Sequence, residues 1–423
     1  MLDQSFSEKN FLKLIKKNSD IGRYSIGSSS EAIKNNFEAL ANEISDYSFT
    51  FEQFQKFKIN GIFFYRTNEY RNEFILRKMS DNFRRLYKIS QADRGKIIEQ
   101  TKTLLLEDTP KFIIRLDIKK FYESIDKELL YQQIFNDPLP SHQTKELLRK
   151  ILLDGYFEHK KGLPRGLSIS AVLSEYYLRD FDAFVKNLEG VYYYARYVDD
   201  IIIFSYKPAL SINKLVKNYL SEHKKLELNT VKSQDILKVC CNCYEGCTCS
   251  NSCKCRAKCN CKPTPEQCNE LDYLGYKFIF SKVPDKNSSL KITLASKKVK
   301  KIKCRIANSF IDYNKTQDIE LLANRIKFLT GNYSISKGKE GNLNSGIYYN
   351  YPMIDIDDDL IALNSFLYAM IHSKNGYIGA KLKNNLTNIQ RNILITNSFK
   401  FGFDSKKINK FKRNEIQKIK RIW

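Results

Sequence analysis

The sequence predicts an α+β fold in which a small antiparallel sheet is enclosed by helices. Residues 111–118 (KFIIRLDI) form a short apolar run with one acid near its end, which is typical of a buried strand. Residues 191–205 (VYYYARYVDDIIIFS) contain two arms rich in β-formers around Val198-Asp199-Asp200, which is the pattern of a hairpin. Helices and strands alternate without the regular spacing of βαβ units, so a mixed α+β core is favoured over a parallel sheet.

The other elements follow from local periodicity. We expect helices within residues 1–60, in the basic stretch 61–105, at 143–153, 168–188 and 212–225, and through most of the chain after residue 295. Residues 226–234 return toward the sheet, and residues 271–281 (LDYLGYKFIFS) form one further β segment.

The charge of the chain indicates a polyanionic partner. Its 423 residues include 71 Lys and Arg against 47 Asp and Glu, which gives a formal charge of +24. An AT-rich genome that inflates lysine content is one explanation, but the basic residues are also locally dense, at 297–305 and again at 406–423. Such segments usually follow a nucleic-acid backbone by neutralising phosphates.

The sequence also excludes membrane and secreted proteins as classes. No run approaches the roughly 18 consecutive apolar residues of a membrane helix, and the N-terminal segment lacks the continuous apolar core of a secretory signal. We therefore expect a cytoplasmic protein with no membrane partner.

Three acidic residues suggest the chemistry. Asp117 ends the predicted strand, and Asp199 and Asp200 lie side by side at the predicted hairpin tip, where their like charges repel. A divalent cation would relieve that repulsion, and Mg²⁺ prefers carboxylate oxygens together with substrate phosphates. Two such ions can stabilise the attacking and leaving oxygens of an in-line displacement, so phosphoryl transfer on a nucleotide is the simplest reaction.

Five segments in order resemble the motifs of reverse transcriptases. They are Asp117 within RLDIKKFYESID (motif A), Leu163-Pro164-Arg165-Gly166 followed by Ser168 and Ser170 (motif B), Tyr197-Val198-Asp199-Asp200 (motif C), Leu228-Asn229 with Lys232 (motif D) and Tyr273-Leu274-Gly275 (motif E). The resemblance covers about residues 75–335 and implies a right-hand polymerase with fingers, a palm built on an antiparallel sheet and a helical thumb. Within that family, the contexts IRLDIKKFYESI, FLTGNY and GIYYNY are most similar to the bacterial defence-associated, abortive-infection-type enzymes.

The resemblance also implies roles for individual residues. Asp117 and Asp199 would be the main Mg²⁺ ligands, with Asp200 assisting and the Ile118 carbonyl completing one site. Lys232 would protonate the diphosphate leaving group. Tyr122 would lie under the incoming sugar and favour deoxynucleotides. The remaining expected contacts are Arg94, Arg77 and Lys78 to the triphosphate, Pro164, Arg165 and Gly166 to the nucleotide, and Tyr273, Leu274 and Gly275 as the primer grip.

Several of these residues also have ordinary structural explanations. Tyr122 could be a core aromatic residue of an amphipathic helix, and Lys232 could be a solvated lysine. Arg165 departs from the family pattern, which has Gln after the proline of motif B. An arginine adds a fixed charge and a bidentate fork, so we expect altered nucleotide or template placement.

A cysteine-rich segment interrupts the chain between motifs D and E. CNCYEG, CTCSNS, CKCRAK and CNCKPT are four consecutive hexads that each open with Cys-x-Cys. Paired thiolates on one side of an extended chain resemble the clusters of metallothioneins, so we expect structural Zn²⁺; the alternative is an oxidisable insertion without metal. The predicted ligands are Cys240, Cys241, Cys243, Cys247, Cys249, Cys253, Cys255, Cys259, Cys261 and Cys268.

These observations give five expected regions and one leading function. The regions are an N-terminal helical part (1–60), fingers and palm (61–238), the Cys-rich insert (239–269), the end of the palm with the primer grip (270–294), and a helical thumb with a basic C-terminal region (295–423).

The function is RNA-directed DNA synthesis from dNTPs in bacterial antiphage defence, with an RNA template that a dedicated non-coding RNA could supply. Protein-primed or untemplated polymerisation, and a non-enzymatic zinc module that binds nucleic acid, are the alternatives. A second copy of the chain or a companion defence protein stays open as a partner.

Overall fold

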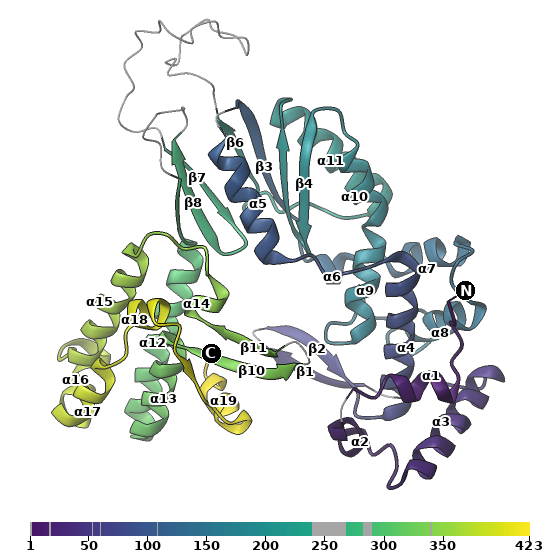
Figure 1. The fold of residues 1–423 in the computed structure, drawn as a ribbon, viewed down its shortest axis with the longest axis horizontal. Helices are drawn as coiled ribbons and strands as arrows, with labels where there is room; N and C mark the ends of the chain where they lie inside the picture. The colour runs from purple at the N-terminus through teal and green to yellow at the C-terminus, as the bar shows by residue number, and fades with distance from the viewer. Residues whose placement is uncertain are drawn as a thin grey trace, which may run out of the picture. The chain divides into compact units, whose positions relative to one another are not determined.

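The computed structural model describes residues 2–16, 18–52, 54–59, 61–107, 109–238, 268–281, 290–338 and 341–423. The chain divides into two units, Met1–Arg94 with Lys111–Leu237, and Gly95–Pro110 with Lys238–Trp423. Strands and helices are mixed in both units (Figure 1), so the predicted α+β class is confirmed.

The first unit is built around a four-stranded sheet with the order β4-β5-β3-β6. β3 pairs antiparallel with β5, and β5 pairs antiparallel with β4, as the predicted hairpin requires. Helices α10 and α11 pack on one face of this sheet (Figure 1), where Ile114 and Leu116 of β3 join the main core. The strands are β3 (Lys111–Asp117), β4 (Val191–Tyr197), β5 (Asp200–Ser205) and β6 (Gln234–Lys238), and the two helices are α10 (Arg179–Lys186) and α11 (Ala209–Lys224).

Helices and a separate hairpin complete the first unit. α4 packs against α9, and α1 packs against α3 and α4. The helices are α1 (Glu8–Lys13), α2 (Asn18–Tyr24), α3 (Ser30–Ser45), α4 (Tyr70–Tyr87), α6 (Phe121–Ser124), α7 (Lys127–Asn136), α8 (His142–Leu152) and α9 (Ser168–Tyr177), and the hairpin is β1 (Gln55–Ile59) with β2 (Ile62–Arg66).

The second unit combines a helical bundle with two small sheets of order β7-β8-β9 and β11-β10-β12. Its helices are α5 (Arg94–Leu106, of which Arg94 belongs to the first unit), α12 (Ser296–Thr316), α13 (Ile319–Thr330), α14 (Ile347–Asn350), α15 (Asp358–His372), α16 (Gly376–Asn385), α17 (Asn388–Ile395), α18 (Phe399–Asp404) and α19 (Arg413–Lys420). Its strands are β7 (Cys268–Tyr273), β8 (Tyr276–Ser281), β9 (Lys291–Leu294), β10 (Asn332–Gly338), β11 (Gly341–Gly346) and β12 (Ile408–Asn409). None of the described helices combines the length and the apolar composition that crossing a membrane requires.

Three segments differ from the elements that the sequence predicted. Residues 55–66 form the β1–β2 hairpin instead of helix, with Gly61 at φ 84° beside the turn. Residues 271–281 belong to two strands instead of one, because Leu274 and Gly275 both adopt left-handed φ (46° and 88°) and turn the chain tightly. The β10–β11 hairpin interrupts the predicted helical region after residue 295, where Ser, Asn and Gly favour turns over helix.

Two glycines with similar backbone conformations differ in what surrounds them. Gly162 has φ 72°, and a Cβ built there would lie 2.2 Å from the Tyr122 carbonyl oxygen. Gly61 has φ 84°, but a Cβ there would have nothing within 4 Å. Gly162 therefore lets two backbone segments of the first unit approach closely, whereas at Gly61 the left-handed φ is required by the turn and not by a close neighbour.

We predict that Gly162→Ala destabilises the protein by more than the roughly 1 kcal/mol that a left-handed alanine alone costs. The control Gly61→Ala should lose only about that amount. Urea denaturation of both variants measures the difference. Equal losses would contradict the close approach at Gly162.

Candidate functional site

Three acidic residues meet at one end of the four-stranded sheet. In the β3–β5 register Asp117 lies directly opposite Asp200, and the amide of Ile118 donates to the carbonyl of Asp199 at 3.0 Å. Residues directly opposite in an antiparallel pair point to the same face, so Asp117 and Asp200 share the face that does not carry α10 and α11. Residues 117 and 199–200, which are distant in sequence, are thus brought together by strand pairing.

The turn that presents Asp199 is strained. Val198 and Asp199 connect β4 to β5, and Val198 adopts φ 60°, a left-handed conformation that a β-branched residue strongly disfavours. Such strain persists only where the surroundings over-determine the backbone, and it is concentrated at functional sites.

A buried arginine supports this turn. Nη1 of Arg196 donates to the Val198 carbonyl at 2.9 Å. The same guanidinium contacts Asp182 at 2.7 and 2.8 Å and Glu175 at 2.7 Å, and its side chain is only 4% exposed. Helices α9 and α10 therefore hold the turn through one fixed side chain.

The carboxylates of Asp199 and Asp200 lie in surroundings that disfavour their charged forms. Burial raises the pKa values of both Asp199 and Asp200; the charge of Asp200 raises that of Asp199 further, whereas Arg115 opposes the rise at Asp200. Arg115 contacts Asp200 at 3.3 Å. Nζ of Lys232 donates to both carboxylate oxygens of Asp117, at 2.8 and 2.7 Å. Asp117 is therefore already paired with one cationic group, the Lys232 ammonium.

The carboxylate oxygens of the site are donor atoms of the type that binds a divalent cation. Carboxylates such as Asp117 and Asp199 are the ligands that Mg²⁺ prefers, and their crowding favours a bound cation. In the part of the chain that the structure describes, no three His, Cys, Asp or Glu side chains are arranged as a ready metal cluster. Lys232 would have to move away from Asp117 to let a metal ion reach its oxygens.

A cavity of about 710 Å³ opens beside these residues. Six basic side chains line it against three acidic ones, so its wall attracts anions despite the aspartates. The predicted site residues among its lining are Asp117, Ile118, Pro164, Arg165, Asp199 and Lys232, and the other basic residues of the lining are Lys119, Lys120, Lys160 and Lys161.

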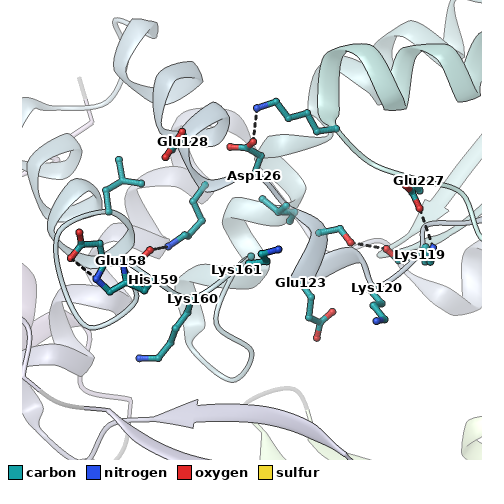
Figure 2. Close-up of a pocket in the computed structure, with 16 residues that line it drawn as sticks. Lys119, Lys120, Glu123, Asp126, Glu128, Glu158, His159, Lys160, Lys161 and Glu227 are labelled. Atoms are coloured by element: carbon teal, nitrogen blue, oxygen red, sulfur yellow. Dashed lines mark hydrogen bonds and ion pairs between the residues drawn. The ribbon is translucent and has the colours of Figure 1, made fainter.

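A second cavity, of about 1100 Å³, shares part of its lining with the first. Figure 2 shows the residues that line this second cavity. The same four lysines line both cavities, together with Glu123 and Gly162. Figure 2 shows Lys160 and Lys161 in the segment before motif B and Lys119 and Lys120 in the segment after β3. Lys127 anchors the first of these segments by donating to the carbonyls of Leu152, Phe157 and Glu158, at 2.8, 2.5 and 2.9 Å.

The lysines differ in how strongly they are engaged. Lys119 contacts Glu227 at 3.1 Å, but both side chains are more than half exposed. Lys160 lies 3.2 Å from the centroid of the Tyr156 ring, and burial together with the charge of Lys56 lowers its pKa. The Lys119–Glu227 ion pair is weak because it is exposed, so Lys119 can readily exchange Glu227 for an incoming phosphate.

Tyr122, Asp200 and Gly166 lie next to the cavity without being among the residues that line it. The Arg165 guanidinium lies 4.7 Å from the centroid of the Tyr122 ring. Gly166 has φ 98°, and a Cβ there would lie 2.5 Å from the Tyr65 carbonyl oxygen, so this position brings motif B against β2.

Two predicted triphosphate contacts, Arg77 and Lys78, are engaged with other groups in the structure. Arg77 is bound to Asp20 at 2.9 Å and Glu73 at 2.8 Å, with its side chain 11% exposed. Lys78 is 2% exposed and donates to the carbonyl of Asp3 at 2.9 Å. Both side chains are committed to the packing of α4 against the N-terminal segment, which argues against nucleotide contact. Arg94, the first residue of α5, is not among the residues that line the cavity.

The remaining predicted residues belong to other parts of the chain. Tyr273, Leu274 and Gly275 form the β7–β8 turn in the second unit, where the Gly275 carbonyl accepts from the Ala295 amide at 3.0 Å. Nine predicted zinc ligands, from Cys240 to Cys261, lie outside the described residues, and Cys268 begins β7.

Several residues of the site carried only weak sequence signals. Lys160 and Lys161 are separated from motif B only by Gly162, and Arg196 stands two residues before Val198, so proximity to a motif was the available indication. Arg115 and Glu123 act through partners that only the fold brings near them, Asp200 and Arg165.

Comparison with known proteins identifies the family. Residues 66–278, half of the chain, match the family described as reverse transcriptase (RNA-dependent DNA polymerase). No curated protein sequence matches the chain.

Solved structures similar to the chain include yeast telomerases. The apo telomerase from Candida tropicalis truncated from its C-terminal domain matches with 13% identity and a TM-score of 0.37, over 62% of this chain and 60% of that one. The telomerase from Candida albicans in complex with a TWJ fragment of telomeric RNA matches with 12% identity and a TM-score of 0.32, over 82% of this chain and 53% of that one. The chain thus spans less than two thirds of the length of these proteins.

We predict that Arg196→Met lowers the free energy of unfolding by about 2–3 kcal/mol, because it removes the buried guanidinium that Asp182 and Glu175 share and leaves these partly exposed carboxylates without their cation. The control Arg85→Met removes an exposed pair with Asp81 on α4 and should change stability by less than about 1 kcal/mol. Denaturant titration of both variants measures the effect. A loss at residue 196 as small as that at residue 85 would contradict a structural role for the network.

Proposed function

The chain belongs to the reverse transcriptase family, and from that membership we propose that it is an RNA-directed DNA polymerase that adds deoxynucleotides to a 3′-OH with the help of two Mg²⁺ ions. The observation that carries the proposal is the register that sets Asp117 opposite Asp200, with Asp199 in the adjoining turn. When bound, the ions would stabilise the attacking and leaving oxygens of the phosphoryl transfer.

Asp117 and Asp199 would hold the metal ions, with the Ile118 carbonyl as a further ligand and Asp200 assisting. Lys232 would release Asp117 and turn to the diphosphate leaving group as its general acid. Its present contacts with Asp117, at 2.7 and 2.8 Å, support this assignment because they keep an ammonium group at the reacting end of the cavity.

The nucleotide would bind in the 710 Å³ cavity. Lys119, Lys120, Lys160 and Lys161 are the triphosphate ligands that we propose, in place of Arg77 and Lys78 and alongside Arg94. This assignment is supported by the cavity lining, to which two separate segments of the chain contribute four lysines. Pro164, Arg165 and Gly166 of motif B would contact the sugar and base, and Tyr273, Leu274 and Gly275 would act as the primer grip.

The β1–β2 hairpin is suited to a single-stranded template. Phe57 and Phe63 are exposed large apolar side chains, and Lys56 lies 3.8 Å from the Phe63 ring centroid. Gly61, Ile62 and Phe63 also line the catalytic cavity. Aromatic faces that stack bases and cations that meet phosphates are the usual combination for such binding, so an RNA template along this hairpin is part of the proposal.

We extend the proposal to the finer expectations of the sequence. The ten cysteines between Cys240 and Cys268 would hold structural Zn²⁺, and metal analysis of protein purified without chelator tests this. The resemblance to abortive-infection-type enzymes supports a role in bacterial antiphage defence, with a non-coding RNA as template; sequencing of the nucleic acid that co-purifies with the protein identifies that template.

We predict that Asp117→Asn and Asp199→Asn each lower the rate of dNTP incorporation on a primed RNA template by about 10³-fold, because each removes a metal-binding charge. The control Asp46→Asn, at the exposed C-terminus of α3, should keep the wild-type rate. A non-enzymatic nucleic-acid-binding module would behave identically in all three variants and would incorporate nothing, which would overturn the proposal.

We also predict that the double variant Lys160→Gln/Lys161→Gln raises the KM for dNTP by about tenfold, since two charged contacts to the triphosphate are lost. The double variant Lys9→Gln/Lys34→Gln, which removes one exposed lysine each from α1 and α3, is the matched control for general charge. Steady-state kinetics at fixed ionic strength distinguish the two. An unchanged KM in Lys160→Gln/Lys161→Gln would exclude these lysines as triphosphate ligands.

A further inference from the structure

Arg165 and Glu123 form a fork-to-fork ion pair on the wall of the catalytic cavity. Nε of Arg165 donates to Oε1 of Glu123 at 2.6 Å, and Nη2 donates to Oε2 at 3.1 Å. Both residues line the cavity. Because each carboxylate oxygen of Glu123 is engaged, the pair offers two charge-assisted hydrogen bonds that hold one geometry.

The guanidinium of this pair also covers Tyr122. Its central carbon lies 4.7 Å from the ring centroid, whereas Tyr122 itself is not among the residues lining the cavity. The backbone below is tied as well, since the amide of Leu163 donates to the Tyr122 carbonyl at 2.8 Å. A ligand in the cavity therefore meets the ion pair first and the aromatic ring behind it.

We propose that the Arg165–Glu123 pair, supported by the Tyr122 ring, is the surface that discriminates between deoxyribose and ribose in the incoming nucleotide. This inference rests on the proposed polymerase function. A 2′-OH directed at the pair meets carboxylate oxygens that already accept hydrogen bonds from Arg165, and the pair can move aside only by breaking two hydrogen bonds and a cation–π contact. Glutamine at position 165 could form neither the fork nor the stack.

The test compares a deoxynucleoside triphosphate with its matched ribonucleoside triphosphate on a primed RNA template. We measure kcat and KM for wild type, Arg165→Gln, Arg165→Lys, Glu123→Gln, Tyr122→Ala and the double variant Arg165→Gln/Tyr122→Ala. Lysine keeps the positive charge but loses the fork and the planar stack, so it is the matched control for charge. Thermal unfolding of each variant verifies that it is folded.

Arg165→Gln, Arg165→Lys and Glu123→Gln should each lower the preference for the deoxynucleotide by about tenfold, mainly through a lower KM for the ribonucleotide. The double variant should discriminate no worse than Tyr122→Ala, because the two residues act as one surface.

Wild-type discrimination in both Arg165→Gln and Glu123→Gln, with loss only in Tyr122→Ala, would overturn the inference in favour of the ring alone. Loss in Arg165→Gln but not in Arg165→Lys would overturn it in favour of charge alone. Failure of wild type to incorporate either nucleotide would instead contradict the polymerase function, so the two failures are distinguishable.

Discussion

Antiparallel pairing between β3 and β5 is the constraint on which the rest of the site depends. It sets Asp117 opposite Asp200 and joins Ile118 to Asp199 through a backbone hydrogen bond. Because side chains alternate along a strand, a shift of one residue in this register would turn Asp117 toward the core face. The apolar residues on that face, Ile114 and Leu116, therefore fix the register and place the acid at the same time.

The site concentrates unfavourable charge, and its basic residues compensate in two different ways. Arg196 is a buried, fixed support for the strained Val198 turn, and Arg115 partly neutralises Asp200. Lys232, by contrast, is 38% exposed and holds Asp117 with a flexible side chain. Fixed arginines suit positioning, whereas a movable lysine suits a group that must exchange with a metal ion and a leaving group. This division agrees with a site that changes its ionic partners during a reaction cycle.

Local patterns in the sequence were sufficient for the central elements and insufficient for their neighbours. The apolar run 111–118 and the two arms around Val198-Asp199-Asp200 predicted β3, β4 and β5 because their periodicity is strong and short-range. The β1–β2 hairpin was missed because residues 55–66 directly precede the basic helical stretch of α4 and share its basic composition. Glu123 could not be assigned, since its partner Arg165 is 42 residues away and only the fold brings them together. Arg77 and Lys78 were predicted from their charge, and charge alone does not reveal that both side chains are largely buried.

Crystallographic anomalous scattering with Mn²⁺ and a non-hydrolysable dNTP analogue would locate the ions and the nucleotide in the site. We expect ion peaks within bonding distance of the Asp117 and Asp199 carboxylates, the triphosphate against Lys160 and Lys161, and the Lys232 amine displaced from Asp117. Asp117 still bound to Lys232, with no ion between residues 117 and 199 at saturating metal and nucleotide, would contradict this expectation.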